Sequence, residues 1–269
     1  MRGSGDPDAW LDDDASPPEC PPGWRTGPPD FVGVGAQKAG TTWWFKLLTA
    51  HPDVHETGGQ RPELHFFDRF VTGWPGPDDV ERYHRFFPRP PGAMAGEKTP
   101  IYMACHWVPR MLRDAAPETR PIVLLRDPIA RYVSGRTHED ARLARVHRGV
   151  RDPANEVRWV SDAFAKGLYA QQLGWLYAAF PREQVLVLQY ERCVADPAAQ
   201  LARTYAFLGL DPFEPPSDEL ARPRNVTRRE KLELEPERRT MLVDLYRDDV
   251  ARLATLVPDI DPALWPDFS

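Results

Sequence analysis

The chain has 269 residues and a formal net charge of −6 at pH 7. Its hydrophobic content of 42% and aromatic content of 11% exclude a disordered chain and indicate a globular protein. The excess of acidic residues argues against a protein that coats nucleic acid, although it permits a basic pocket within an acidic surface.

The cysteines and the hydropathy pattern bear on whether the protein has disulfides, binds a metal or enters a membrane. Cys20, Cys105 and Cys193 are odd in number and lack the spacing of metal ligands, so we expect neither a disulfide framework nor a metal site. The N-terminus is acidic and proline-rich, and no apolar run is long enough to cross a membrane. We therefore expect a soluble cytoplasmic protein without a membrane partner. The sequence does not indicate its oligomeric state.

The basic residues are mostly arginine, with five lysines among the 34 Lys and Arg residues. Together with 30 prolines, this composition fits a GC-rich genome and leads us to expect a bacterial protein. Because lysines are few, those that fall within motifs draw attention as candidate functional residues.

The pattern along the chain predicts one folded domain. Residues 1–29 contain clusters of Gly, Pro and Asp without periodicity, which predicts a flexible leader. Residues 30–269 are enough for a single α/β domain. Because helical patterns separate the apolar runs, we expect a parallel sheet covered by helices. The buried strands are expected near residues 31, 94, 122 and 185.

The expected helices follow from apolar periodicity. They cover residues 41–51, 164–180, 197–208 and 237–256, and another begins at Ile129. Asp196 is expected to cap the third of these helices. The Arg-rich segment 142–158 has no clear period and is expected to be irregular. The inward face of the last helix is expected to hold Leu242, Leu245, Tyr246, Leu253 and Leu256.

Residues 31–51 join a strand, a tight loop and a helix. The loop is made of small residues and carries Lys38, and the helix is expected to begin at Thr41 or Thr42 with a hydroxyl at its N-cap. The free amides and positive dipole of a helix N-terminus attract anions, and Gly40 lets the backbone approach one closely. An ordinary turn between strand and helix is the simpler interpretation, but the joint occurrence of these residues predicts a phosphate site.

The order of residues in this loop separates it from the nucleoside-triphosphate loop. That loop reads G-x-x-x-x-G-K-[ST], with its lysine directly after the last glycine. Here Lys38 lies two positions before Gly40, and Thr41 follows the glycine. The predicted anion is therefore not the triphosphate of ATP.

Two further charged residues stand in unusual settings. Glu63 precedes the aromatic pair Phe66 and Phe67, and a carboxylate beside aromatic rings can have a raised pKa and act as a general base. Lys98 lies between an expected strand and Pro100. Taken alone, each residue would be interpreted as a solvated surface charge.

The segment from residue 122 carries a second anion-binding pattern. Residues 122–125 are apolar and predict a buried parallel strand, and Arg126 follows at the carboxyl end, where α/β folds bind ligands. Ser134 lies eight residues later, and a guanidinium with a hydroxyl suits a phosphate. Asp127 is expected to cap the following helix, and a local ion pair with Arg126 is the alternative.

These segments together resemble sulfotransferases that use 3′-phosphoadenosine 5′-phosphosulfate (PAPS). GAQKAGTTWW (35–44) resembles their 5′-phosphosulfate loop, and RPELHFFD (61–68) resembles the base-carrying segment of heparan sulfate sulfotransferases. GEKTPIYM (96–103) is similar to their catalytic lysine element. The segment from Pro121 to Glu139 is similar to their 3′-phosphate element. The likeness spans residues 31–265 in motif order.

The resemblance implies roles for particular residues. Glu63 would be the general base, while Lys38 and Lys98 would stabilise charge on the leaving phosphate and on the transferring group, without a metal. Near residue 224 the family's usual Lys-Gly-Arg pattern is absent. The donor-binding residues implied are Lys38, Ala39, Gly40, Thr41, Thr42, Trp43, Arg126, Ser134, Tyr169 and Arg224.

The resemblance also implies a three-layer α/β fold similar to that of P-loop kinases. The implied reaction moves a sulfuryl group from PAPS to an acceptor hydroxyl or amine, and releases 3′-phosphoadenosine 5′-phosphate (PAP). From the acidic charge and the expected location, we expect a small secondary metabolite as acceptor. A glycan acceptor is the alternative.

Other interpretations of the same residues stay open. A small-molecule kinase could share the fold, and a nucleotide- or carbohydrate-binding module could have lost catalysis. His65, His106 and His138 are alternative bases, because cytosolic aryl and steroid sulfotransferases use a histidine. None has that setting here, since Lys98 is followed by Thr-Pro-Ile-Tyr.

Overall fold

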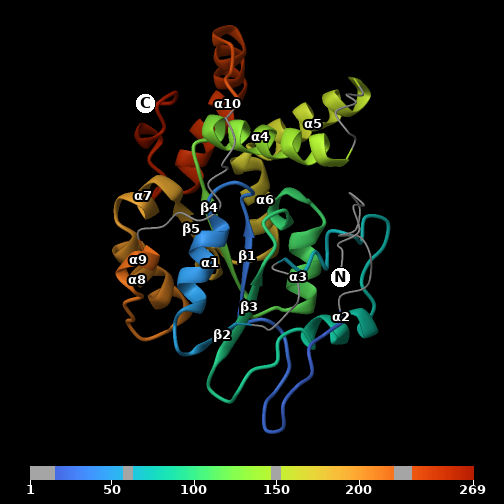
Figure 1. The fold of residues 1–269 in the computed structure, drawn as a ribbon. Coiled ribbons are helices and arrows are strands. Elements are labelled where there is room, and N and C mark those ends of the chain that lie inside the picture. Colours follow the sequence, from blue (N-terminus) through green and yellow to red (C-terminus); the bar gives the residue numbers. More distant parts are fainter. Residues whose placement is uncertain (1–15, 57–62, 147–152, 221–231) are drawn as a thin grey trace.

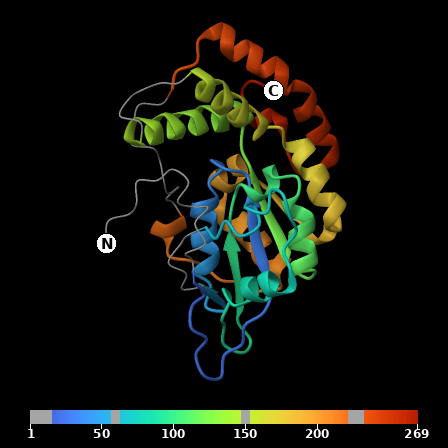
Figure 2. The same cartoon turned by 90° about the vertical axis from the view of Figure 1, so that its right-hand side faces the viewer.

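The computed structural model describes residues 16–56, 63–146, 153–220 and 232–269. They form a parallel sheet between two layers of helices, with a further pair of helices beyond one end of the sheet (Figures 1 and 2). This arrangement confirms the α/β class and the parallel sheet that the sequence predicts.

Among the described residues the sheet contains five strands in the order β2-β3-β1-β4-β5, and the pairings between these strands are parallel. The four predicted strands are present. The sequence does not predict β2, because three residues with one apolar side chain carry no period. The strand bounds are β1 Phe31–Gly35, β2 Val54–Glu56, β3 Met94–Lys98, β4 Arg120–Leu125 and β5 Leu186–Gln189.

Helices cover both faces of this sheet (Figure 1). The α-helices are α1 Thr41–Thr49, α2 Pro77–His84, α3 Val108–Ala115, α4 Pro128–Val146, α5 Pro153–Ala165, α6 Tyr169–Ala179, α7 Tyr190–Ala195, α8 Pro197–Leu208, α9 Ser217–Leu220 and α10 Pro236–Leu256. Short 3₁₀ turns are η1 Tyr102–Ala104, η2 Arg182–Gln184 and η3 Pro262–Leu264. Helix α1 packs against α8, whereas α3 and α10 pack against α6. None of the described helices has the length and apolar character needed to cross a lipid bilayer.

The central position of β1 places three predicted motifs side by side. Strand β1 pairs with β3 on one side and with β4 on the other. Because all three strands run in the same direction, their carboxyl ends at Gly35, Lys98 and Leu125 meet at one edge. Helices α4 and α5 pack against each other and lie beyond this edge (Figure 2).

Two predicted helical boundaries are wrong. The helix expected over 164–180 is two helices, because α5 ends at Ala165 and α6 begins at Tyr169. The turn between them contains Gly167, where a Cβ would lie 2.6 Å from the Tyr246 hydroxyl, so α10 packs too closely for a larger residue. The segment 142–158, expected to be irregular, is partly helical, since α4 continues to residue 146 and α5 starts at residue 153.

The predicted inward face of helix α10 is wrong at one residue. Leu242, Tyr246 and Leu253 are buried as expected, whereas Leu245 is 54% exposed. The buried stripe recurs every three or four residues from Leu242, and Leu245 falls one position before that stripe. Asp196, in contrast, caps α8 as predicted, because its carboxylate accepts a hydrogen bond from the Ala199 amide at 3.0 Å.

The predicted leader is described only from residue 16 onward. Arg25 pairs with Arg89 in an isolated antiparallel bridge, and the Arg89 guanidinium donates to the Pro28 carbonyl at 2.9 Å. Residues 1–15 lie outside the described part of the chain, so the leader boundary at residue 29 stays a prediction.

Candidate active site

A cleft of about 1190 Å³ opens at the carboxyl edge of the sheet, beneath α4 and α5. The β1–α1 loop and the residue after β4 line it, together with the face of α4 that turns toward the loop. Lys38, Glu63, Arg126 and Ser134, which lie far apart in sequence, all line this one cleft. The sequence motifs therefore converge on a common site.

The start of α1 differs from the expected hydroxyl cap. Gly40 occupies the N-cap position with φ of 87°, and no side chain caps the helix. Glycine is required there, because its backbone is left-handed and a Cβ would lie 2.7 Å from the Tyr190 ring. Thr41 and Thr42 are the first helical residues and line the cleft, and neither hydroxyl caps the helix.

Lys38 lies in the loop with φ of 69°, a left-handed conformation that a non-glycine residue adopts at some cost. Burial lowers the pKa of its ammonium to about 8, although the nearby carboxylates of Glu63 and Glu139 oppose that effect. The loop thus holds a partly desolvated cation beside the helix N-terminus, which is a favourable site for an anion.

Arg126 is tied directly to this loop. Its Nη1 donates to the carbonyl of Lys38 at 3.2 Å, and its guanidinium lies 5.0 Å from the centre of the Tyr190 ring. Ser134 lines the cleft from α4. Tyr169 is fully buried, and its hydroxyl donates to the Arg126 carbonyl at 2.8 Å. Tyr169 therefore fixes the backbone of Arg126 from within the core.

The remaining predicted donor-binding residues divide into two groups. Ala39 and Trp43 are buried, and neither is among the residues that line the cleft. Arg224 lies outside the described residues.

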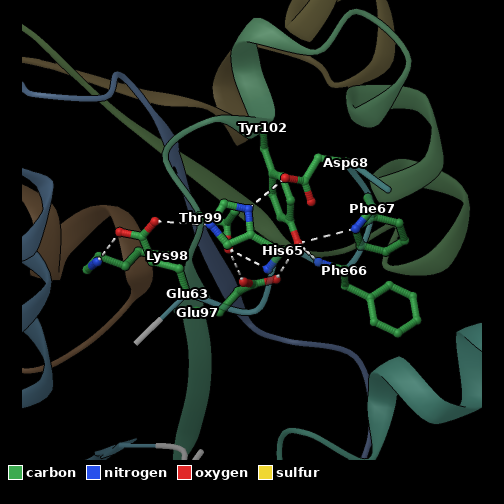
Figure 3. Close-up of polar contacts among 9 residues, drawn as sticks. All are labelled: Glu63, His65, Phe66, Phe67, Asp68, Glu97, Lys98, Thr99 and Tyr102. Carbon is green, nitrogen blue, oxygen red and sulfur yellow. Dashed lines mark hydrogen bonds and ion pairs between the residues drawn. The ribbon is translucent and has the colours of Figure 1, made fainter. Parts of the chain in front are cut away.

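Glu63, which lines the cleft, forms an ion pair with Lys98, which is buried and is not among the lining residues (Figure 3). Lys98 Nζ donates to Glu63 Oε1 at 2.8 Å, with the lysine side chain 4% and the glutamate side chain 29% exposed. His65 Nε2 lies 3.5 Å from Glu63 Oε2, and His65 Nδ1 lies 2.6 Å from Asp68 Oδ2. Glu63 thus stands between an ammonium and an imidazole.

The electrostatics of this cluster correct the expected pKa of Glu63. Burial raises the pKa of Glu63, but the hydrogen bond from His65 and the charge of Lys98 outweigh burial and hold it below its ordinary value. The expectation of a raised pKa was based on the neighbouring phenylalanines, and these rings pack away from the carboxylate against Tyr83. Glu63 is therefore ionised at neutral pH.

The histidines differ sharply in their fitness as bases. Burial lowers the pKa of His65, but its bonds to Asp68 and Glu63 dominate and raise it to about 9. An imidazolium cannot accept a proton, so His65 is no base at neutral pH. His106 is exposed and packs against Trp107, away from the cleft lining, whereas His138 lines the cleft from α4.

The sequence patterns do not identify Lys166, which also lines the cleft. Its ammonium pairs with Asp162 at 2.6 Å, and its charge contributes to the lowered pKa of Lys38. Lys166 follows the last turn of α5. Because lysines are few in this chain, the sequence could have marked this residue as a candidate functional residue. The predicted continuous helix over this region obscured its position.

Side chains from three other helices fix the end of α5. The Arg131 guanidinium of α4 donates to the Ala163 carbonyl, and the Tyr246 hydroxyl of α10 donates to the Phe164 carbonyl at 2.9 Å. Gln172 of α6 donates to the next carbonyl, that of Ala165, at 3.0 Å. The Phe164 and Ala165 carbonyls also accept backbone hydrogen bonds, from Gly167 at 2.9 Å and from Leu168 at 3.1 Å, so the side-chain donors add to the turn that ends the helix. The turn that carries Lys166 is thus held by contacts from three other helices.

Comparison with known proteins agrees with this geometry. The family described as "Sulfotransferase domain" matches residues 28–226. The human heparan sulfate glucosamine 3-O-sulfotransferase 6 is 33% identical over 195 residues, which cover 70% of this chain and 54% of that protein. The chain thus spans about half the length of the curated relatives that it matches.

Solved structures extend the likeness to the fold. A sulfotransferase from Alicyclobacillus acidocaldarius superposes with a TM-score of 0.68 at 26% identity, covering 88% of this chain and 98% of that one. The mouse sulfotransferase SULT7A1, crystallised with PAP, has a TM-score of 0.53 at 15% identity and covers 83% and 85% of the two chains, so it shares the fold alone. On the family match and these relatives, the chain belongs to the sulfotransferase domain family.

Proposed function

We propose that this protein transfers a sulfuryl group from PAPS to a hydroxyl or amine of a small acceptor, with Glu63 as the general base. One observation carries the proposal. The Glu63–Lys98 ion pair lies at the same cleft as the anion-binding loop and Arg126, so a base and two phosphate-binding elements face one space.

The residues present suit the two phosphate ends of the donor. Lys38 and the amides of residues 40–42 would hold the 5′-phosphosulfate, because a helix N-terminus and a cation favour negative charge. Arg126 and Ser134 would hold the 3′-phosphate through a planar guanidinium and a hydroxyl. The hydrogen bond from Arg126 to the Lys38 carbonyl fixes the spacing between these two elements.

The donor supplies the sulfuryl group, whose bond to the phosphate oxygen breaks as the acceptor oxygen or nitrogen bonds to sulfur. Glu63 takes the acceptor proton on its carboxylate. Lys98, within hydrogen-bonding distance of Glu63, stabilises charge on the oxygens of the transferring group, and Lys38 stabilises the leaving phosphate. Holding these groups in fixed geometry avoids solvent reorganisation during the reaction.

The cleft wall supports a small acceptor of low charge. Near Lys38 it carries the acidic Glu139, and Lys166 is neutralised by Asp162. Trp159 adds an aromatic surface to the same lining. Such a wall suits a compact, partly apolar metabolite better than a polyanion.

A glycan acceptor is the second candidate. It is favoured by the similarity to the human protein named as a heparan sulfate glucosamine 3-O-sulfotransferase. A kinase reaction is disfavoured, because the loop lacks the lysine directly after Gly40 that the triphosphate motif requires.

The test of the base is a single substitution. Incubation with ³⁵S-labelled PAPS and a panel of phenols, alcohols, amines and heparan oligosaccharides should label at least one acceptor with the wild type. Glu63→Gln should lower that rate by about 10²–10⁴-fold, as expected for loss of a general base. Circular dichroism should show it folded.

The exposed Glu183 provides a matched control, and Glu183→Gln should keep the wild-type rate. A Glu63→Gln protein with full activity would remove the assignment of the base. No labelled acceptor across the whole panel, despite donor binding, would favour a binding module over an enzyme.

A further inference from the structure

Strand β3 places two consecutive charged residues on opposite faces of the sheet. Successive side chains of a strand alternate in direction, so Glu97 and Lys98 point to different sides. Lys98 reaches Glu63 at the cleft, whereas Glu97 is 3% exposed and lies in the core. A carboxylate in such a position is costly unless it is hydrogen-bonded.

Three hydroxyl groups surround the buried carboxylate of Glu97. Tyr83 donates to its Oε1 at 2.8 Å, and Thr99 donates to its Oε2 at 2.7 Å. The Tyr102 hydroxyl lies 3.4 Å from Oε1. Burial raises the pKa of Glu97 to about 7 in spite of these bonds. The fold thus keeps the Glu97 carboxylate in the core although its burial is energetically unfavourable.

Two of these hydroxyls also reach the loop of residues 63–68, here called the Glu63 loop (Figure 3). The Tyr102 oxygen accepts hydrogen bonds from the amides of Phe66 at 2.8 Å and Phe67 at 3.4 Å. The Thr99 oxygen lies 3.4 Å from the amide of His65. Because each hydroxyl gives its proton to Glu97, its lone pairs are directed at the loop amides.

The Glu63 loop needs such support. His65 has φ of 50°, an uncommon conformation for a residue with a side chain, and strained residues persist when their surroundings determine them. This conformation directs the His65 ring between Glu63 and Asp68. The two hydroxyls hold the amide of this strained residue and the amides of the two residues that follow it.

We propose that Glu97 and Tyr102 are positioning residues that hold the Glu63 loop so that the Glu63 carboxylate stays between Lys98 and His65. The chain of contacts runs from Glu97 through the Tyr102 hydroxyl to the loop amides, and neither residue lines the cleft. This inference rests on the proposed function for the role of Glu63.

Two tyrosines provide a matched test. Tyr83 and Tyr102 are both fully buried and both hydroxyls approach Oε1 of Glu97, but of the two only the Tyr102 hydroxyl has a contact to the Glu63 loop. Tyr102→Phe therefore removes the support of the loop, while Tyr83→Phe removes a bond to Glu97 alone. Both substitutions keep the ring in the core.

The first readout is the titration of His65 by NMR, which requires no acceptor. Groups that act on His65 are the carboxylates of Glu63, Asp68 and Glu97, and Lys98 forms an ion pair with the first of these. In ¹⁵N-labelled protein, the His65 signals are identified by their loss in His65→Asn. The wild-type ring should titrate near pH 9.

Tyr102→Phe should lower this value by about one pH unit or more, because a carboxylate in hydrogen-bonding range shifts a pKa by about 1–3 units. Tyr83→Phe should leave it near the wild-type value. Equal values in all three proteins, or an equal fall in both variants, would overturn the proposal, since the tyrosines would then serve the core alone.

The second readout is turnover of labelled PAPS with an acceptor that the wild type uses. Tyr102→Phe should lower kcat about 10- to 100-fold with the donor KM unchanged, and Tyr83→Phe less than about threefold. Glu97→Gln, which keeps an acceptor oxygen, should retain more activity than Glu97→Ala. A wild type without turnover would remove the proposed function, while the NMR comparison would still decide whether Tyr102 holds the loop.

Discussion

The ammonium of Lys38, which lines the cleft, is expected to lose its proton within the pH range in which the activity can be measured. Burial lowers the pKa of its ammonium to about 8 in the free protein. The donor binds as a polyanion and needs the charged form, so kcat/KM for PAPS should fall about tenfold per pH unit above about pH 8. Steady-state kinetics between pH 6 and 10 measure this decline.

Lys38→Arg provides the control for that decline, because a guanidinium stays protonated throughout this range. Its kcat/KM should begin to fall only where His65, with a pKa of about 9, loses its proton. An alkaline limb in the same place for both proteins would show that Lys38 does not cause it.

Lys98 controls the acid side of the profile through Glu63. Its charge helps to hold the pKa of Glu63 below the ordinary value, so Lys98→Met should raise that pKa by about one unit or more. The acid limb of kcat/KM should move to higher pH by the same amount, because Glu63 must be ionised to accept a proton. The exposed Lys46 serves as the control, and Lys46→Met should leave the limb in place. An acid limb that Lys98→Met does not move would contradict the coupling.

For individual residues, the sequence predicted Lys38, Glu63, Lys98 and Arg126 as site residues. The structure places Lys38, Glu63 and Arg126 in the lining of one cleft and pairs Lys98 with Glu63. It misjudged the pKa of Glu63, because the hydrogen bond from His65 and the charge of Lys98, which lies 35 residues away along the chain, together outweigh burial. The sequence showed His65 and the phenylalanines beside Glu63, but it could not show which of these side chains faces the carboxylate.

Among the elements, the end of α5 depends on its neighbours more than on its own sequence. The hydroxyl of Tyr246 reaches the Phe164 carbonyl only because Gly167 leaves room for it. A Cβ at Gly167 would lie 2.6 Å from that hydroxyl, so Gly167→Ala should lower the free energy of unfolding by about 1–3 kcal/mol. Urea unfolding followed by circular dichroism measures the change.

Gly174 in α6 is the matched control, because nothing lies within 4 Å of a Cβ built there. Gly174→Ala should raise the free energy of unfolding by about 0.5–1 kcal/mol, the usual gain in a helix interior. If both substitutions stabilised the protein, the close packing of α10 on the turn would be wrong.

The break between α5 and α6 also shows what periodicity misses. Phe164 and Leu168 are four residues apart, as on one face of a continuous helix, so the apolar pattern does not mark the turn between them. At the break, Arg131, Gln172 and Tyr246 donate hydrogen bonds to the last carbonyls of α5, and the contacts from Arg131 and Tyr246 come from residues distant in sequence. The sequence did not predict strand β2, because three residues are too few to show a period.

Across the whole molecule, the order of strands assembles the site. Strand β1 lies between β3 and β4, so the loop after β1 is flanked by Lys98 and Arg126 at one edge. Ligands of open α/β sheets bind at this carboxyl edge. The sequence predicted parallel strands and their carboxyl-end residues, but the order of strands follows from long-range packing and not from any single segment.

We expect this cleft to bind a nucleotide that carries a 3′-phosphate. Calorimetric titration of PAP without Mg²⁺, with ATP as comparator, tests it on the wild type, Arg126→Ala and the surface control Arg110→Ala. We predict micromolar binding of PAP to the wild type and the control, at least about tenfold weaker binding to Arg126→Ala, and no binding of ATP. Preference for ATP with Mg²⁺ would contradict the account and favour a kinase.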